Sequence, residues 1–196
     1  AAGFNGNGAI HTPNLDSLAQ TGMIFDNAFV TTSISSPSRA ALLTGRYGSA
    51  NGVLQFGEVS LYKDEKTFAE YLKEAGYQTG IVGKWHLKDT PQSCGFDYAS
   101  YFFSNGPWYN RNVNEDGRKK TAYGYIEHYN ARKAIAFIDS ASKKENPFLL
   151  FLCTQIPHLD HHFNWNVRNS TMDKYYQDVN IAPPENWQDD LSGKPL

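Results

Sequence analysis

The sequence predicts an α/β fold: a three-layer α/β/α sandwich around a mainly parallel sheet. Helical and strand-like patterns alternate along the chain, and residues 148–152 (FLLFL) form an entirely apolar run. Such a run is typical of a strand that other elements cover on both faces of a parallel sheet. With 196 residues and 40% hydrophobic content, the chain can build a sizeable core, as one domain or as part of a larger one.

The first elements follow from local signals. A Thr-Pro pair at residues 12–13 opens a helix that Gly22 ends. Residues 23–30 are rich in apolar and aromatic side chains and predict a strand. Residues 48–63 predict a loop.

The middle of the chain predicts a second helix–strand pair. Thr67 and Glu70 form a capping box at the start of a helix that ends at Gly76, and residues 78–83 predict a short strand. Residues 89–122 show no clear pattern. A long helix is expected over about residues 123–142, with one apolar stripe. The stripe comprises Ala131, Ala134, Ile135 and Ile138.

Bulk properties exclude several functions. The formal net charge is −2, and no dense basic run is present, so we expect no nucleic-acid partner. No apolar stretch is long enough to span a bilayer, so we expect no membrane partner. The two cysteines, Cys94 and Cys153, make neither a disulfide framework nor a zinc site.

The most informative stretch is residues 35–46 (SSPSRAALLTGR). A helix that begins at Pro37 points its free N–H groups back at Ser35, which suits an anion such as sulfate or phosphate. Arg39 lies four residues past Ser35 and can reach the same anion. By themselves, the residues favour a simpler interpretation: an ordinary capped helix with Arg39 as a surface charge.

Two further clusters follow predicted strands. Residues 83–87 (GKWHL) place Lys84 and His86 two positions apart, on the same side of an extended chain. His158 follows the apolar strand 148–152. Because ligands collect at the carboxyl ends of parallel strands, we expect both clusters to meet Ser35 there.

Each of these residues also has a simpler interpretation. Lys84 could point to solvent, His86 could pack beside Trp85, and His158 could be structural. His161 and His162 are interpreted as loop residues, possible rim groups of the pocket, because no cysteine or carboxylate frame supports zinc.

Residues 35–46 resemble the signature of type I, formylglycine-dependent sulfatases, in which Cys or Ser is followed by x-Pro-x-Arg and then Leu-Thr-Gly-Arg. Residues 83–86 (GKWH) resemble the second sulfatase signature, and Pro157-His158 resembles the family's Pro-His. The resemblance runs from about Thr12 to Leu196. It implies an alkaline-phosphatase-like fold and a serine-type enzyme. Residues 1–196 would be part of the catalytic domain, an internal fragment without the first strand and the C-terminal part, with poor activity alone.

The resemblance also implies roles. Ser35 would be oxidised by a maturation enzyme to formylglycine, an aldehyde; one hydroxyl of its hydrate attacks sulfur, and the other then expels sulfate. Arg39 and Lys84 would hold charge on the sulfuryl oxygens. His86 would orient the formylglycine. His158, alone or with Lys84, would protonate the leaving oxygen. Arg46 is assigned to supporting structure around Ser35.

The family's site is normally completed by Ca²⁺, with Ser35 as one ligand. The resemblance places its main carboxylate ligands, an Asp-Asp and an Asp-Asn pair, outside this chain. Asp189 and Asp190 are adjacent but follow no strand, and we do not expect them to bind the metal.

The substrate predicted by the resemblance is a sulfated carbohydrate, since residues 95–97 and 190–193 are similar to sulfatases that act on glycans. Aromatic residues between positions 96 and 129 could line a sugar pocket or pack at the sheet edge. A bacterial, periplasmic or extracellular protein is implied. Two alternatives stay open: a phosphoryl-transfer relative that uses unmodified Ser35, and an inactive fragment that binds sulfate.

Overall fold

The computed structural model describes residues 2–57, 59–162, 174–180, 182–183 and 187–188. Asp189, Asp190 and the segment 190–193 lie outside the described residues. The chain divides into two compact units, residues 1–28 with 167–196, and residues 29–166. Every candidate catalytic residue belongs to the second unit.

The first unit contains a short 3-10 helix, η1 (Gly3–Asn5), and α1 (Pro13–Thr21). The helix predicted from the Thr-Pro pair is confirmed, with Pro13 as its first residue. The Thr12 hydroxyl ties the two elements together, since Oγ1 accepts from the Gly3 amide at 2.8 Å and donates to Asp16 Oδ1 at 2.9 Å. None of the residues of α1 is buried.

The strand predicted over residues 23–30 is wrong, because that segment is irregular. Met23, Phe25 and Phe29 are 78%, 73% and 88% exposed. A strand needs a neighbouring backbone to pair with, and an apolar pattern does not supply one.

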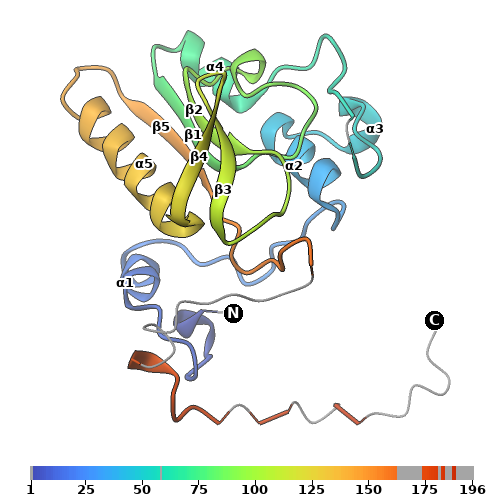
Figure 1. The fold of residues 1–196 in the computed structure, drawn as a ribbon. Helices are drawn as coiled ribbons and strands as arrows, with labels where there is room; N and C mark the ends of the chain where they lie inside the picture. Colours follow the sequence, from blue (N-terminus) through green and yellow to red (C-terminus); the bar gives the residue numbers. More distant parts are fainter. Residues whose placement is uncertain (1, 58, 163–173, 181, 184–186, 189–196) are drawn as a thin grey trace, which may run out of the picture. The chain divides into compact units, whose positions relative to one another are not determined.

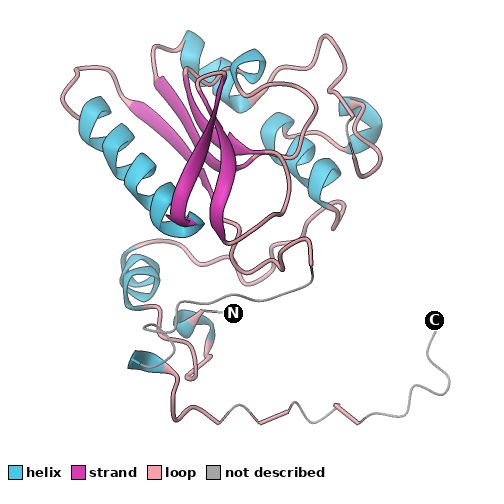
Figure 2. Cartoon of the chain, in the orientation of Figure 1, coloured by secondary structure: helices cyan, strands magenta, loops and turns pink. Residues whose placement is uncertain are grey.

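The second unit is built on a five-stranded sheet (Figures 1 and 2). Its strand order is β4-β3-β2-β1-β5, with β1 parallel to β2 and β5 and with β2–β3 and β3–β4 antiparallel. The strands are β1 (Gln78–Lys84), β2 (Tyr98–Phe102), β3 (Tyr109–Glu115), β4 (Arg118–Tyr125) and β5 (Phe148–Cys153). The helices are α2 (Ser35–Thr44), α3 (Gly48–Asn51), α4 (Phe68–Glu74), the 3-10 turn η2 (Gln92–Cys94) and α5 (Ile126–Ala141).

Helices cover both faces of this sheet, which confirms the three-layer architecture. On one face, Ile81 of β1 lies beside Ala99 of β2 and packs in a core with Leu43 of α2 and Ala69 of α4. On the other face lies α5: Phe137 stacks on Tyr98 with ring centroids 5.6 Å apart. Successive residues of β2, Tyr98 and Ala99, therefore point to different helical layers.

The unpatterned region 89–122 contains most of the antiparallel half of the sheet. Strands β2, β3 and β4 lie between residues 98 and 125, so α5 begins at Ile126 rather than near residue 123. The buried positions of β3 are Arg111 and Val113, and in β4 only Ala122 is buried, so these strands lack the regular apolar alternation that a strand prediction needs. The predicted loop 48–63 also contains the short α3.

Two predicted elements differ in burial. In α5, Ala134 is buried, but Ile135 and Ile138 of the predicted stripe are 65% and 41% exposed. Residues 148–152 do form a strand, β5, but its side chains are only partly covered, because in the described chain β5 pairs with β1 alone. Among the described helices, none is long and apolar enough to cross a membrane.

Candidate active site

Ser35, Lys84 and His158 lie within one hydrogen-bonded chain. Ser35 is the first residue of α2, Lys84 ends β1, and His158 follows β5. Lys84 Nζ lies 3.2 Å from Ser35 Oγ, and it also donates to Asn105 Oδ1 at 2.8 Å. Asn105 Nδ2 in turn lies 2.8 Å from Nδ1 of His158. The predicted convergence of the three segments is thus present in the structure.

The helix that carries Ser35 starts earlier than the sequence predicted. It begins at Ser35 and not at Pro37, with the Ser38 amide donating to the Ile34 carbonyl at 2.9 Å. Ser35 therefore lies inside the first turn. Proline is tolerated there because its missing N–H would have no partner within the helix.

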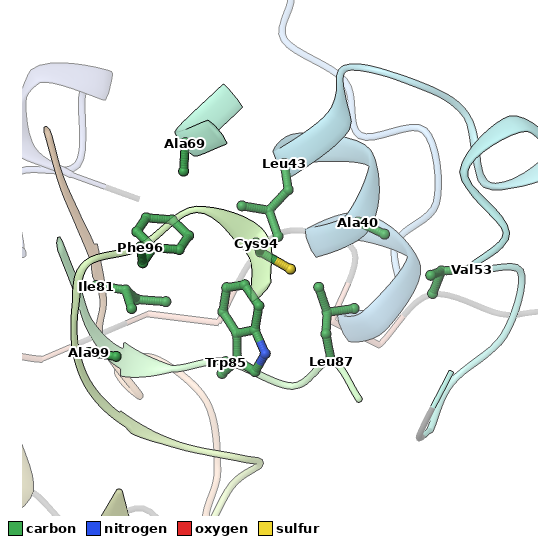
Figure 3. Close-up of a cluster of buried hydrophobic side chains, with 10 residues drawn as sticks. All are labelled: Ala40, Leu43, Val53, Ala69, Ile81, Trp85, Leu87, Cys94, Phe96 and Ala99. Carbon is green, nitrogen blue, oxygen red and sulfur yellow. The ribbon is translucent and has the colours of Figure 1, made fainter. Parts of the chain in front are cut away.

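The core fixes the end of β1. Trp85 and Leu87 are both 1% exposed and pack among the buried side chains near Ala40 and Leu43 of α2 (Figure 3). Arg39 of α2 donates from Nη1 to the Lys84 carbonyl at 2.8 Å, which ties the helix to the strand. At least one nitrogen of Arg39 is therefore engaged by the main chain and not free for an anion.

Lys84 is a buried cation, with 3% of its surface exposed. Burial, and then the charges of Arg39 and Arg111, lower its pKa to about 8. No carboxylate in the described part of the chain forms an ion pair or hydrogen bond with Lys84. At neutral pH the group still carries most of its charge, held in a site that lacks a negative partner.

His86 is also buried, at 3% exposure, between the rings of Phe56 and Phe103. Burial, and then the charges of Lys84, Arg39 and His158, lower its pKa to about 4, so it is neutral near pH 7. Its Nδ1 has no hydrogen-bond partner within the part of the chain that the structure describes. The described structure shows no hydrogen bond between His86 and Ser35.

Asn105 is a site residue that the sequence analysis missed. It lies in the loop between β2 and β3 and touches both Lys84 and His158. No motif includes it, and its region showed no periodicity. The only available signal was its place just after a strand, which could not be recognised.

A buried network lies behind Asn105. Arg111 of β3 donates to the Ser104 carbonyl and to the Gln155 side chain, and its guanidinium lies 3.6 Å from the Phe102 ring centre. Burial lowers the pKa of Arg111 to about 10, against an opposing influence of Glu127. Arg111 thereby joins the loop between β2 and β3, which carries Ser104, to the segment after β5, which carries Gln155.

Arg46 is not placed where the sequence analysis expected it. It follows α2, whose last residue is Thr44, and donates to Glu65 Oε1 at 2.7 Å with its side chain 57% exposed. Ser35 is at the opposite end of a helix of about 15 Å, so direct support of Ser35 by Arg46 is wrong. The rings of His161 and His162, in the turn after His158, are tilted by 47° to each other with their centroids 3.9 Å apart.

Most aromatic side chains between residues 96 and 129 pack against the sheet. Phe96, Phe102 and Trp108 are at most 3% exposed, whereas Tyr123 is 76% exposed. Packing at the sheet accounts for most of these rings, and a sugar pocket built from the whole set does not.

A cavity of about 500 Å³ adjoins Ser35, but it is lined by Arg39, Leu152, Cys153 and neighbours rather than by Lys84 or His158. The described residues contain no group of three or more His, Cys, Asp or Glu side chains able to hold a metal ion. Calcium takes mostly carboxylate and carbonyl oxygens, whereas Ser35 contacts the Lys84 ammonium and lines a cavity with Arg39. The residues present therefore do not fit a calcium site by themselves.

Comparisons with known proteins identify the family of the chain. The sequence model of the family described as Sulfatase matches residues 1–182. The chain belongs to the sulfatase family.

Sulfatases of several organisms are similar to it. An N-acetylglucosamine-6-O-sulfatase of Bacteroides thetaiotaomicron is 33% identical, over 96% of this chain and 33% of that protein. Human arylsulfatase G is 36% identical, over 76% of this chain and 37% of that protein. The chain thus spans about a third of the length of these relatives.

Solved sulfatase-like structures have the same fold. One, described as a complex with its substrate D-glucosamine-2-N,6-O-disulfate, superposes with a TM-score of 0.83 and is 32% identical, over 97% of this chain and 37% of that chain. A crystal structure of Ps i-CgsB in complex with k-i-k-neocarrahexaose gives a TM-score of 0.82 and 31% identity, over 91% of this chain and 46% of that chain.

Proposed function

We propose that this sulfatase-family chain forms part of the catalytic centre of an enzyme that hydrolyses sulfate esters of carbohydrates. The proposed site residues are Ser35, Arg39, Lys84, His86 and His158. The observation that carries the proposal is the buried ammonium of Lys84, which contacts Ser35 and has no carboxylate partner among the described residues. A buried unpaired charge costs free energy, and an anionic group bound at Ser35 would compensate it.

Each side chain has a distinct part in this proposal. Lys84 binds the sulfuryl oxygens and, with a pKa of about 8, can also give up a proton near neutral pH. Arg39 holds the end of β1 through Nη1 and offers its other nitrogens to the anion. His86 stays neutral and presents an unpaired Nδ1. His158 lies at the exposed end of the chain of hydrogen bonds, where a leaving oxygen would be.

Ser35 is proposed as the residue that a maturation enzyme and its electron acceptor convert to formylglycine. The modified residue would supply a hydrated aldehyde as a stronger nucleophile than a serine hydroxyl without an adjacent base. Calcium, with Ser35 as a ligand, remains a prediction from the family. No step of the proposal passes through the ion, because the described residues lack a carboxylate set for it.

The proposed substrates are sulfated glycans. The names of the relatives, an N-acetylglucosamine-6-O-sulfatase and a complex with glucosamine disulfate, support this class. We further propose a periplasmic or extracellular location, which fractionation of the producing cells would test.

The test expresses the whole protein with and without a formylglycine-generating enzyme. We expect release of sulfate from sulfated saccharides only after maturation, together with loss of two hydrogen atoms from the mass of the Ser35 peptide. Ser35→Ala should abolish turnover, whereas Ser49→Ala, at an exposed position outside the site, should not.

The alternatives give other results. Phosphate release by protein with unmodified Ser35 would replace the proposal with phosphoryl transfer. Binding of sulfated saccharides without any turnover after maturation would replace it with an inactive binding protein.

A further inference from the structure

Asn105 lies between two proposed catalytic groups, Lys84 at the end of β1 and His158 in the segment after β5. Its Oδ1 is 2.8 Å from Lys84 Nζ, and its Nδ2 is 2.8 Å from His158 Nδ1 and 3.3 Å from Nε2. One side-chain amide therefore bridges the ammonium and the imidazole.

The two partners fix the orientation of this amide. A lysine ammonium only donates hydrogen bonds, so the amide oxygen of Asn105 must face Lys84. The amide NH₂ then faces His158, and since NH₂ also only donates, the ring nitrogen that it contacts must offer a lone pair. The nearer ring nitrogen is Nδ1, at 2.8 Å against 3.3 Å for Nε2.

His158 Nδ1 has a second and competing neighbour. The Leu159 carbonyl oxygen lies 3.0 Å from the same nitrogen, and a carbonyl only accepts. Nδ1 cannot accept from Asn105 and donate to Leu159 at the same time. If Nδ1 donates to Leu159, Asn105 can donate only to Nε2, at the longer distance of 3.3 Å. Whichever contact prevails decides whether the ring proton is on Nδ1 or on Nε2.

The shorter contact is with Asn105, and the surrounding structure keeps it in place. Arg111 donates to the Ser104 carbonyl, and Gln155 Nε2 donates to the Gly106 carbonyl at 3.1 Å, so both neighbours of Asn105 are held. The backbone amide of His158 donates to the Gln155 carbonyl at 2.8 Å. Gln155 is 1% exposed and thus anchors the loops of both Asn105 and His158.

We propose that Asn105 is a positioning residue that holds His158 as the neutral tautomer with its proton on Nε2. Double protonation of His158 would turn an N–H of the ring toward the NH₂ of Asn105. Resting on the proposed function, this makes His158 a hydrogen-bond donor to the leaving oxygen, through Nε2–H, and not the group that transfers a proton to it. The proton then comes from the ammonium of Lys84, the other proton donor of the proposed site.

The experiment is long-range ¹H–¹⁵N correlation of the whole protein labelled at histidine, near pH 7, with the His158 signals assigned by their loss in His158→Gln. We expect the wild-type ring to be neutral with the proton on Nε2. A proton on Nδ1, or on both nitrogens, would overturn the proposal without any variant. The resting tautomer is observable whether or not the protein hydrolyses a sulfate ester. Failure of the tautomer proposal can therefore be distinguished from failure of the proposed function.

Two variants sharpen the result. In Asn105→Ala, Nδ1 should donate to the Leu159 carbonyl, and in Asn105→Asp it should donate to the new carboxylate, so both should move the proton to Nδ1. If sulfatase activity is present, kcat should fall about 10²-fold with KM little changed. Asn112→Ala, an exposed position on β3, should leave the tautomer and kcat unchanged. An unchanged tautomer in both Asn105 variants would contradict the proposal.

Discussion

Lys84 and Arg111 are both buried basic side chains, at 3% and 6% exposure, but their surroundings differ. Arg111 has a carbonyl, an amide oxygen and an aromatic ring around its guanidinium, with Glu127 near enough to favour its charge. Among the described residues, the Lys84 ammonium has a hydroxyl and an amide oxygen as its hydrogen-bond partners, and the charges that lower its pKa are those of Arg39 and Arg111.

The difference distinguishes a cation that stabilises the fold from a cation that is available to bind an anionic ligand. Arg111 joins two loops, and its hydrogen-bond donors have partners within the chain. Its charge therefore stabilises the fold. Lys84 is held by the core through its neighbour Trp85 while its charge stays uncompensated. A fold can retain such a group at a cost in stability where an anionic ligand supplies the missing partner.

The largest expected effect is that of Lys84→Met, which keeps the apolar stem and removes the charge. We expect sulfate release by the matured whole protein to fall about 10³-fold, as for loss of one charge-stabilising donor. The free energy of unfolding should stay equal or rise, because the buried charge is destabilising. Lys88→Met, at an exposed position, is the matched control for activity and denaturant unfolding. A large decrease in the free energy of unfolding of Lys84→Met would show that Lys84, like Arg111, stabilises the fold.

Arg111→Met should show the opposite pattern. Loss of the guanidinium leaves the Ser104 carbonyl and the Gln155 side chain without their partner, at a cost of about 2–4 kcal/mol in the free energy of unfolding. Urea denaturation against Arg118→Met, an exposed position on β4, measures it. Equal stability of the two variants would show that Arg111 does not hold the loops.

His86→Phe tests whether the buried imidazole is neutral. Its pKa is about 4 in the folded protein and 6.5 ordinarily, so the unfolded chain binds more protons between those values. The free energy of unfolding should therefore fall as pH drops from 6.5 to 4, by up to about 3 kcal/mol from this group. The Phe variant should lose that part of the slope and lose activity, whereas His128→Phe, at an exposed position, should keep both. An unchanged slope in His86→Phe would show that His86 titrates normally.

Gly106→Ala should give the smallest effect. A Cβ there would lie 2.8 Å from a guanidinium nitrogen of Arg111, so the Arg111 side chain must shift. We expect a loss of about 1–2 kcal/mol in thermal or urea unfolding. Gly8→Ala, where a Cβ would meet nothing within 4 Å, is the control. A neutral Gly106→Ala would mean that Arg111 has room to adjust.

Much of the fold was predictable where local signals are strong. The capping box at Thr67 is present in full, and β1 and β5 lie where their apolar runs predict them. The strand predicted at residues 23–30 was wrong, and β2 to β4 were missed, because pairing and burial depend on neighbours that a periodic pattern does not specify.

The sequence by itself determined the chemical groups of the candidate site, since residues 35–39, 84–86 and 158 carry the sulfatase resemblance. Only the tertiary structure decided that Asn105 links Lys84 to His158 and that Arg111 holds the loops behind them. Lys84 and Ser35 are 49 positions apart in the chain, and Asn105 and His158 are 53 apart. Hydrogen bonds over such separations follow from the packing of the strands and loops that carry them, which no local pattern in the sequence encodes.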